Sequence, residues 1–331
     1  AGAARHSGRL PNVRALSICI VSTTSWRSRK GNRVTAVRWS RLLRSLGHRV
    51  RIEEQYDGRA CDVLVALHAR RSFPSVQRFA RRYPQRPIIL ALTGTDLYRD
   101  IRSSRSAQKA LAKASRLVVL QPLAVAELPA AARAKAQVIL QSAQAPSAKQ
   151  RPRSDAFEVC VLGHLRPVKD SFRAAQAARK LPSTSRIRIL QVGGALSPAM
   201  KARALKEQQV NPRYRWLGEL PRAKALRVMG RCRLLALTSR MEGGANVISE
   251  AVTWGVPVLS SRIPGSIGLL GPAYPGYFEP EDTAGLTKLL LRSEREPPFL
   301  RTLRRDCAKL APRFRPQRER EAWARLLREV A

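Results

Sequence analysis

The chain is poor in acidic residues and has no long apolar run. It contains 23 Asp and Glu against 62 Lys and Arg, and no acidic residue precedes Glu53. No apolar stretch reaches the roughly 20 residues of a membrane-spanning helix, so we expect no stable membrane insertion. The apolar stretch 15–21 is short and has no small-residue cleavage pattern. We interpret it as a buried strand rather than a signal peptide.

Cysteines are few, and their spacing excludes two classes of site. The five are scattered, and no two form a CxxC pair: Cys19, Cys61, Cys160, Cys232 and Cys307. A disulfide framework or a zinc site is therefore not expected. Buried thiols in a reducing compartment fit this pattern, and we predict a cytoplasmic protein.

Basic residues dominate the remainder, giving a formal net charge of +39. Such a chain attracts phosphates, nucleic acid or an anionic membrane surface. The excess of arginine also has a compositional explanation, as in a coding sequence of high GC content. Nucleic-acid binding is not expected, because aromatic residues make up only 5% of the chain and no stripe of basic and aromatic residues is visible. An anionic substrate or membrane partner remains open.

Short apolar runs alternate with helical patterns along two halves of the chain. The first set of strand-like runs is 15–22, 48–54, 61–68, 87–94, 116–121 and 136–142, and the second is 157–163, 186–193, 214–220, 233–239 and 256–261. This alternation predicts two α/β domains with doubly wound parallel sheets, facing a cleft. We expect an N-terminal extension (1–14), a first Rossmann-like domain (15–144), a linker rich in Pro, Ser and charge (145–156), a second Rossmann-like domain (157–315) and an amphipathic C-terminal helix (316–331) packed back on the first domain.

The stretch EGGANVISEA at 242–251 follows an apolar strand-like run and opens a helical pattern. Gly243 and Gly244 form a turn, and Asn246 is expected to cap the helix. A glycine turn before a helix presents free backbone N–H groups to an anion such as phosphate. The two glutamates, Glu242 and Glu250, suit hydroxyl groups of a sugar, which donate hydrogen bonds. The alternative for Glu250 is an ordinary surface glutamate.

The stretch GHLRPVKD at 163–170 places two cations, Arg166 and Lys169, after the first strand of the second half. Two cations near a helix start suit a diphosphate. The chain has no DxD motif to hold a divalent metal against a nucleotide-sugar diphosphate, so these cations could neutralise the leaving phosphates instead. We expect no metal and no cofactor. The alternative is a solvated basic loop.

Together these motifs carry a resemblance to a known family. EGGANVISEAVTWGVPVLSS resembles the E-x7-E signature of the retaining GT-B glycosyltransferases of family 4, with GHLRPVKD, LQVGG and WLGEL in that family's order. More narrowly, SRKGNRVTAVRW, DVLVALHARRS, ALTGTDLYRD, SSRIPGSIGLLG and YPGYF are similar to the selenosugar synthase family of selenoneine biosynthesis. The likeness covers nearly the whole chain after about residue 15.

The resemblance implies a donor site in the second domain. That family joins the sugar of UDP-N-acetylglucosamine or UDP-glucose to selenophosphate, which forms a carbon–selenium bond. By resemblance Arg166, Lys169 and Glu242 would be catalytic. The donor would be bound by Gly163, Leu217, Gly218, Leu220, Gly243, Gly244, Ala245, Asn246, Val247 and Glu250, with Glu250 on the ribose and Leu217 to Leu220 along the uracil.

The acceptor would lie against the first domain. Candidate contacts come from the turn before its first helix and from the ends of two strands: Lys30, Gly31, Asn32, His68, Arg70, Thr93, Gly94, Thr95 and Asp96. Arginine, lysine, hydroxyls and backbone N–H groups suit a small, highly charged anion. The alternative for His68 is a structural hydrogen bond. Family-4 enzymes often carry a histidine near the TGTD element, and its position here is Thr93.

The sequence therefore predicts a glycosyltransferase whose partners are small-molecule substrates. A selenium nucleophile is already anionic, so a strong general base is not required. An alcohol or a lipid head group is the alternative acceptor. A basic nucleic-acid-binding protein with a degenerate transferase fold is the non-enzyme alternative.

Overall fold

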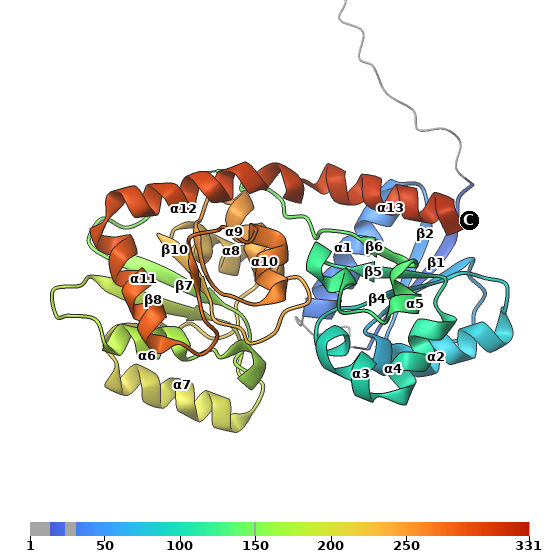
Figure 1. The fold of residues 1–331 in the computed structure, drawn as a ribbon, viewed down its shortest axis with the longest axis horizontal. Helices are drawn as coiled ribbons and strands as arrows, with labels where there is room; N and C mark the ends of the chain where they lie inside the picture. The colour runs from blue at the N-terminus through green and yellow to red at the C-terminus, as the bar shows by residue number, and fades with distance from the viewer. Residues whose placement is uncertain (1–13, 24–30, 149, 331) are drawn as a thin grey trace, which may run out of the picture.

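The structure is a computed structural model that describes residues 14–23, 31–148 and 150–330. Two α/β domains lie side by side, and each is built around its own sheet (Figure 1). All strand pairings between the named strands are parallel. The predicted fold class, two Rossmann-like domains, is confirmed.

The first domain has a six-stranded sheet in the order β2-β1-β3-β4-β5-β6 within the described residues. Its strands are β1 (Ser17–Ser22), β2 (Arg49–Glu53), β3 (Val63–Leu67), β4 (Ile88–Ala91), β5 (Arg116–Val119) and β6 (Ala136–Val138). Its helices are α1 (Gly31–Ser45), α2 (Ala69–Arg82), α3 (Ile101–Ser103), α4 (Arg105–Lys113) and α5 (Ala130–Arg133). Strands β3 and β4 are buried along their whole length, which explains their unbroken apolar sequences.

The second domain has a six-stranded sheet in the order β12-β11-β10-β7-β8-β9, again within the described residues. Its strands are β7 (Phe157–Leu162), β8 (Ile187–Val192), β9 (Tyr214–Trp216), β10 (Leu234–Leu237), β11 (Val258–Ser261) and β12 (Tyr277–Phe278). Its helices are α6 (Arg173–Arg179), α7 (Pro198–Val210), α8 (Arg222–Gly230), α9 (Asn246–Thr253), α10 (Pro264–Leu270), α11 (Thr283–Arg295) and α12 (Pro297–Leu310). The sequence pattern did not reveal β12, because two residues are too few to show periodicity.

Helix α13 (Pro316–Val330) carries the chain back from the second domain to the first. In Figure 1 it continues the line of α12 across the top of the molecule to the first domain, where Glu329 near its end pairs with Arg116 at the start of β5. Trp323, Leu326 and Leu327 are buried in the apolar cluster that α1 forms with the first sheet. The Trp39 and Trp323 rings meet edge to face, with centroids 4.8 Å apart, a geometry that favours aromatic pairs.

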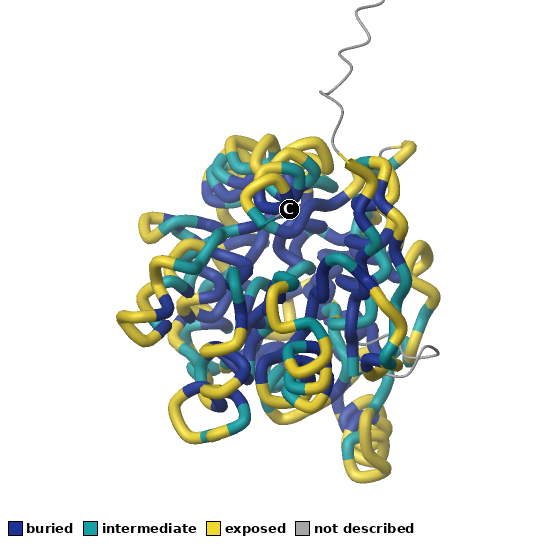
Figure 2. The backbone as a smooth tube through the Cα atoms, turned by 90° about the vertical axis from the view of Figure 1, so that its right-hand side faces the viewer, coloured by how far each residue is buried: buried dark blue, intermediate teal, exposed yellow. Residues whose placement is uncertain are grey.

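Each sheet lies in the interior, beneath its helices. Figure 2 shows buried segments inside and exposed residues concentrated on the outer turns. Separate apolar clusters cover the two faces of the first sheet, and one cluster surrounds the second sheet. Across the described part of the chain, no helix combines the length and the apolar character needed to cross a lipid bilayer.

Candidate functional site

The second sheet has a topological switch point between β7 and β10. Strand β7 pairs with β8 on one side and with β10 on the other, although β10 comes much later in the sequence. The loops after β7 and β10 leave the sheet at its carboxyl edge, and such crevices are where parallel α/β sheets bind ligands. The first of these loops contains the predicted segment 163–170, and the second, together with the start of α9, contains the segment 242–251.

Lys169 and Glu242 meet across this switch point. The Lys169 ammonium forms an ion pair with Oε1 of Glu242, whose side chain is nearly buried. Ser239 donates a 2.6 Å hydrogen bond to the same oxygen. The Thr238 hydroxyl donates to the Lys169 carbonyl at 3.1 Å and so fixes the cationic loop to the end of β10. Arg166, at the start of the same loop, is exposed and available to an anion.

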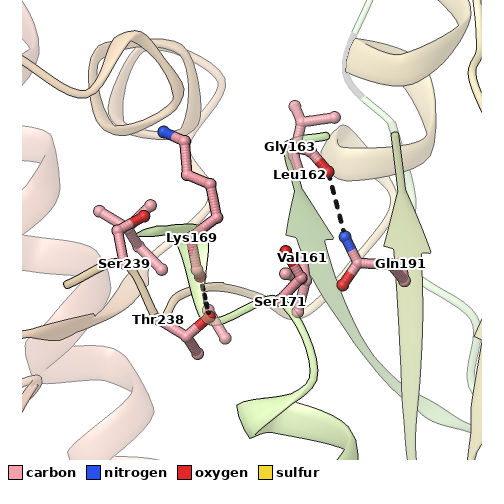
Figure 3. Close-up of a pocket in the computed structure, with 10 residues that line it drawn as sticks. Val161, Leu162, Gly163, Lys169, Ser171, Gln191, Thr238 and Ser239 are labelled. Carbon is pink, nitrogen blue, oxygen red and sulfur yellow. Dashed lines mark hydrogen bonds between the residues drawn. The ribbon is translucent and has the colours of Figure 1, made fainter. Parts of the chain in front are cut away.

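A small hollow lies under these groups at the carboxyl ends of β7, β8 and β10. Apart from space that is open to solvent, it has room for about one water molecule, and its lining includes Lys169, Ser171 and Gln191. Within the described residues, Ser171 Oγ and Gln191 Oε1 are buried without a hydrogen-bond partner. Figure 3 shows the Gln191 amide nitrogen bonded to the Gly163 carbonyl. The Lys169 ammonium points away from the side chains of Ser171 and Gln191. A bound water or ligand polar group could satisfy the two free oxygens.

Glu250 is a buried carboxylate, so the surface alternative for this residue is wrong. Its side chain is 5% exposed and forms an ion pair with Arg222, the first residue of α8. Burial raises the pKa of Glu250, and the positive charges of Arg222 and Arg38 oppose that rise. A buried carboxylate beside a half-exposed cation can still accept hydrogen bonds from a ligand hydroxyl.

Asn246 does not cap helix α9 as expected. It is the first helical residue, and Ala245 before it has no side chain that could cap the helix. The Asn246 Oδ1 instead accepts a 3.0 Å hydrogen bond from Nη1 of Arg38, in the first domain. The prediction failed because a helix start read from sequence is uncertain by a residue or two. Ala245 and Val247, on either side, are buried.

The glycines of this loop lie against the first domain. A Cβ on Gly243 would come within 2.5 Å of the Thr93 carbonyl carbon, and one on Gly244 within 2.4 Å of Leu120 Cβ. Real Cβ contacts are never so short, so only glycine allows the two domains to approach this closely. Whether the same glycines also admit a phosphate remains a prediction.

The segment Leu217 to Leu220 runs along the end of β8. The Gly193 N–H donates to the Gly218 carbonyl at 2.8 Å, and Leu217 and Leu220 are half-buried. Gly193 itself has a left-handed φ of 146°, and a Cβ there would meet the Gly163 carbonyl at 2.0 Å. This close approach brings Leu217 to Leu220 to the same sheet edge as the cationic loop. The structure leaves contact with a nucleobase as a prediction.

In the first domain, the ends of β3 and β4 meet as predicted from their positions. His68, which follows β3 with a left-handed φ of 76°, lies with Nε2 3.1 Å from the Thr95 hydroxyl. Asp96 is fully buried, and its carboxylate accepts backbone N–H bonds from Ala69, Thr93 and Gly94 at 2.9 Å each. Burial lowers the pKa of His68, which favours the neutral ring. The His68 ring also has a structural role, since Nε2 contacts the Thr95 hydroxyl and Nδ1 accepts from the Arg71 backbone N–H in α2.

The remaining acceptor candidates differ in position. Arg70 is half-exposed and donates to Asp100 at 2.9 Å. Gly31 and Asn32 begin α1, whereas Lys30 lies outside the described residues. Gly94 borders the second domain, since a Cβ there would lie 3.2 Å from the Gly243 nitrogen. The loop 93–96 therefore lies directly against the loop that starts at Glu242.

Sequence reasoning missed two residues of this region, Arg38 and Arg222. Each pairs with a predicted site residue, Arg38 with Asn246 and Arg222 with Glu250. No spacing singles them out among the 62 Lys and Arg. Among the described residues, no three His, Cys, Asp or Glu side chains are grouped so that they could hold a metal ion.

Solved structures with the same architecture are known. HepE of Anabaena, in a structure that holds UDP and glucose, has a TM-score of 0.75 at 16% identity, covering 95% of this chain and 100% of its own. Sucrose-phosphate synthase of Thermosynechococcus elongatus has a TM-score of 0.75 at 14% identity, with coverages of 95% and 98%. The lipopolysaccharide outer core galactosyltransferase WaaB reaches 0.64 at 12% identity, with coverages of 95% and 99%. At these identities the likeness shows the fold.

A match to a sequence-family profile shows which family the chain belongs to. No curated protein sequence matches the chain significantly. The sequence profile of the family described as glycosyl transferases group 1 matches residues 143–312, which contain the linker, the cationic loop and both glutamates. That match spans more than half of the 331 residues, and the chain therefore belongs to the glycosyl transferases group 1 family.

Proposed function

We propose that the protein transfers the sugar of UDP-N-acetylglucosamine or UDP-glucose to selenophosphate. The observation that carries a transferase role is the meeting of Lys169 and Glu242 at the β7–β10 switch point, beside the contact between the domains. The UDP complexes of the similarly folded HepE support a UDP-sugar donor. The choice of selenophosphate rests on the sequence resemblance to selenosugar synthases.

The donor would lie along the carboxyl edge of the second sheet. Glu250, held by Arg222, would accept hydrogen bonds from the ribose hydroxyls, and the base would lie along Leu217 to Leu220. The diphosphate would lie between the cationic loop and the first turn of α9, whose free N–H groups favour an anion. Glu242 would contact the sugar while still bonded to Ser239.

In the proposed reaction the bond between the anomeric carbon and the UDP oxygen breaks, and UDP leaves with both electrons of that bond. Selenium supplies both electrons of the new carbon–selenium bond, so the immediate product carries sugar, selenium and a phosphoryl group. Lys169 and the exposed Arg166 would stabilise the charge that develops on the leaving diphosphate. We propose that this stabilisation needs no metal ion.

The acceptor would approach from the first domain. The His68 ring, the Thr95 hydroxyl and the Arg70 guanidinium lie at the ends of β3 and β4, close to the loop that Glu242 begins. Because burial lowers the pKa of His68, the neutral ring is favoured, and through its contact with the Thr95 hydroxyl it can hold that hydroxyl toward a substrate oxygen. Selenophosphate is already anionic, so the reaction does not need His68 as a strong base.

The experiment that tests this function measures UDP release from each UDP-sugar in EDTA, with and without selenophosphate. We expect UDP release that depends on selenophosphate, together with a selenium-bearing sugar detected by mass spectrometry. The product mass also shows whether the phosphoryl group stays on selenium. Inorganic phosphate at the same concentration is the matched control, because it has the charge without the selenium nucleophile.

Other outcomes would overturn defined parts of the proposal. UDP binding without a selenium product would retain the donor and overturn the acceptor, and alcohols and lipid head groups would then be tested. Turnover that returns only when a divalent metal is added would overturn the metal-free step. Salt-sensitive nucleic-acid binding with no UDP-sugar turnover would favour the non-enzyme alternative.

A further inference from the structure

Arg38 lies where four separate segments of the chain meet. It belongs to α1 of the first domain, and its side chain is 17% exposed. Nη1 donates to the Ser142 carbonyl at 3.2 Å, in the stretch that connects β6 to β7, and to Asn246 Oδ1 at 3.0 Å, at the start of α9. Its Nε lies 3.4 Å from Oε1 of Glu319, on α13. One guanidinium therefore joins both domains, the connecting segment and the C-terminal helix.

Glu319 holds this guanidinium in place. Its side chain is fully buried, and a buried carboxylate is tolerated only when it is paired and hydrogen-bonded. It accepts from the Trp39 indole at 2.7 Å, and from the backbone N–H and the hydroxyl of Ser142 at 2.9 Å and 2.5 Å. Burial lowers the pKa of Arg38, but the charge of Glu319 opposes that shift. The pair is thus a fixed charged unit, not a mobile surface contact.

The third partner, Asn246, belongs to the proposed donor site. Its side-chain oxygen is turned toward the first domain rather than toward the N–H groups of its own helix. Gln141 completes the set when its amide oxygen faces the nearby donors. That oxygen then accepts from Arg38 Nη2 at 2.7 Å, and the amide nitrogen donates to Asn246 Oδ1 at 2.8 Å. These bonds to the Asn246 side-chain oxygen therefore come from outside its own domain.

We propose that Arg38 is a positioning residue for nucleotide-sugar binding, which acts through Asn246. The bond fixes the first turn of α9, between Glu242 and Glu250, relative to the first domain. An anchor for α13 alone would need only the contacts with Glu319 and Ser142, which exist without Asn246. The added bond makes the geometry of the donor loop depend on how the two domains are placed. This inference rests on the proposed function, because it assumes that α9 meets the donor.

The test is a double-mutant cycle on UDP binding by the full chain, measured by calorimetry. Arg38→Met and Asn246→Ala should each raise the Kd for UDP about tenfold, as expected for loss of one charged hydrogen bond at the site. If Arg38 acts through Asn246, the double variant should be no weaker than the worse single variant. Arg41→Met is the matched control, since Arg41 is an exposed arginine one turn further along the same helix.

Arg38→Lys separates a positioning role from a purely structural one. Lysine can pair with Glu319, but it lacks the planar fork that reaches Ser142, Asn246 and Glu319 together. We expect this variant to unfold near the wild-type temperature and still bind UDP several-fold more weakly, in line with the loss of the guanidinium bond to Asn246. It also keeps the test valid if Arg38→Met does not fold.

The two proposals fail in different ways. Wild-type affinity for UDP in Arg38→Lys, or tenfold effects that multiply in the double variant, would overturn the positioning role and leave the proposed function intact. A wild-type chain that does not bind UDP would overturn the proposed donor, and the role of Arg38 with it.

Discussion

Two loops that face each other across the domain boundary use a carboxylate in opposite ways. Each loop follows a buried parallel strand, β4 for residues 93–96 and β10 for residues 238–245. The Asp96 carboxylate accepts hydrogen bonds from three backbone N–H groups of its own domain. Glu242 instead bonds to two side chains, the Lys169 ammonium and the Ser239 hydroxyl.

The difference separates a carboxylate that shapes the site from one that can do chemistry. The Asp96 bonds fix the backbone of the acceptor-side loop, and a ligand could not replace them without unfolding it. The Lys169 ammonium is partly exposed, so its charge can be shared with an incoming phosphate at little structural cost. Position at a strand end is therefore not enough to identify a candidate catalytic carboxylate. Whether its hydrogen-bond partners are backbone N–H groups or side chains must also be known.

The largest expected effect comes from exchanging these two acids for their amides. Asp96→Asn should lower the free energy of unfolding by about 2–4 kcal/mol, because its new NH2 group must face at least one buried backbone N–H. Glu242→Gln should lower it by a smaller amount, since Ser239 can still donate to the amide oxygen and the partly exposed Lys169 can turn toward solvent. Chemical denaturation of both variants measures the two free energies of unfolding and tests their predicted order.

Turnover should show the reverse order for the amide pair. Glu242→Gln should slow UDP release strongly at little cost in stability, whereas the folded fraction of Asp96→Asn should retain more activity. Equal losses of stability in the two variants would contradict the distinction drawn between the loops.

The second-largest effect on turnover is expected for Arg166, the exposed cation of the loop 163–170. Arg166→Ala should lower turnover about 10²- to 10³-fold, the range for removing one group that stabilises developing charge. Because Arg166 is exposed, thermal unfolding should change little. Exposed Arg215→Ala, on β9 of the same sheet, is the control and should leave turnover unchanged. Turnover near the wild-type rate in Arg166→Ala would remove that residue from the diphosphate site.

The fold and the placement of the two candidate loops at one sheet edge could be predicted from the sequence because their signals are local. Buried parallel strands such as β3 and β7 are nearly continuous apolar runs. The cationic loop and EGGANVISEA each follow such a run, which places both at one sheet edge. That Lys169 reaches Glu242 follows from the adjacency of β7 and β10.

The contacts between domains could not be predicted in this way. Arg38 and Asn246 are 208 residues apart, and no periodicity links a position in α1 to the start of α9. Arginine is so common in this chain that its identity at position 38 carries no signal. The role of Asp96 was hidden for another reason, since an acid at a strand end looks the same whether it bonds to backbone or to substrate.

The smallest effect should be a pH dependence that separates Glu250 from the other acids. Burial raises the pKa of Glu250, and Arg222 is the first of the charges that lower it again. Its contribution to stability is therefore present at low pH and lost as pH rises through that raised pKa. Binding runs the other way, because ribose hydroxyls need the ionised carboxylate.

Removal of the Arg222 charge should move the titration of the Glu250 carboxylate to higher pH. In Arg222→Met the Kd for UDP, relative to wild type, should rise as the pH falls, because the Glu250 carboxylate loses its nearest cation and takes up a proton more readily. The ratio to wild type cancels the protonation of UDP itself. Arg227→Met, an exposed arginine on the same helix, should give a ratio that does not change with pH. A pH-independent ratio for Arg222→Met would mean that the ionisation of Glu250 does not govern donor binding. Glu242, paired with Lys169, and Glu250, paired with Arg222, would then have different roles in the proposed site.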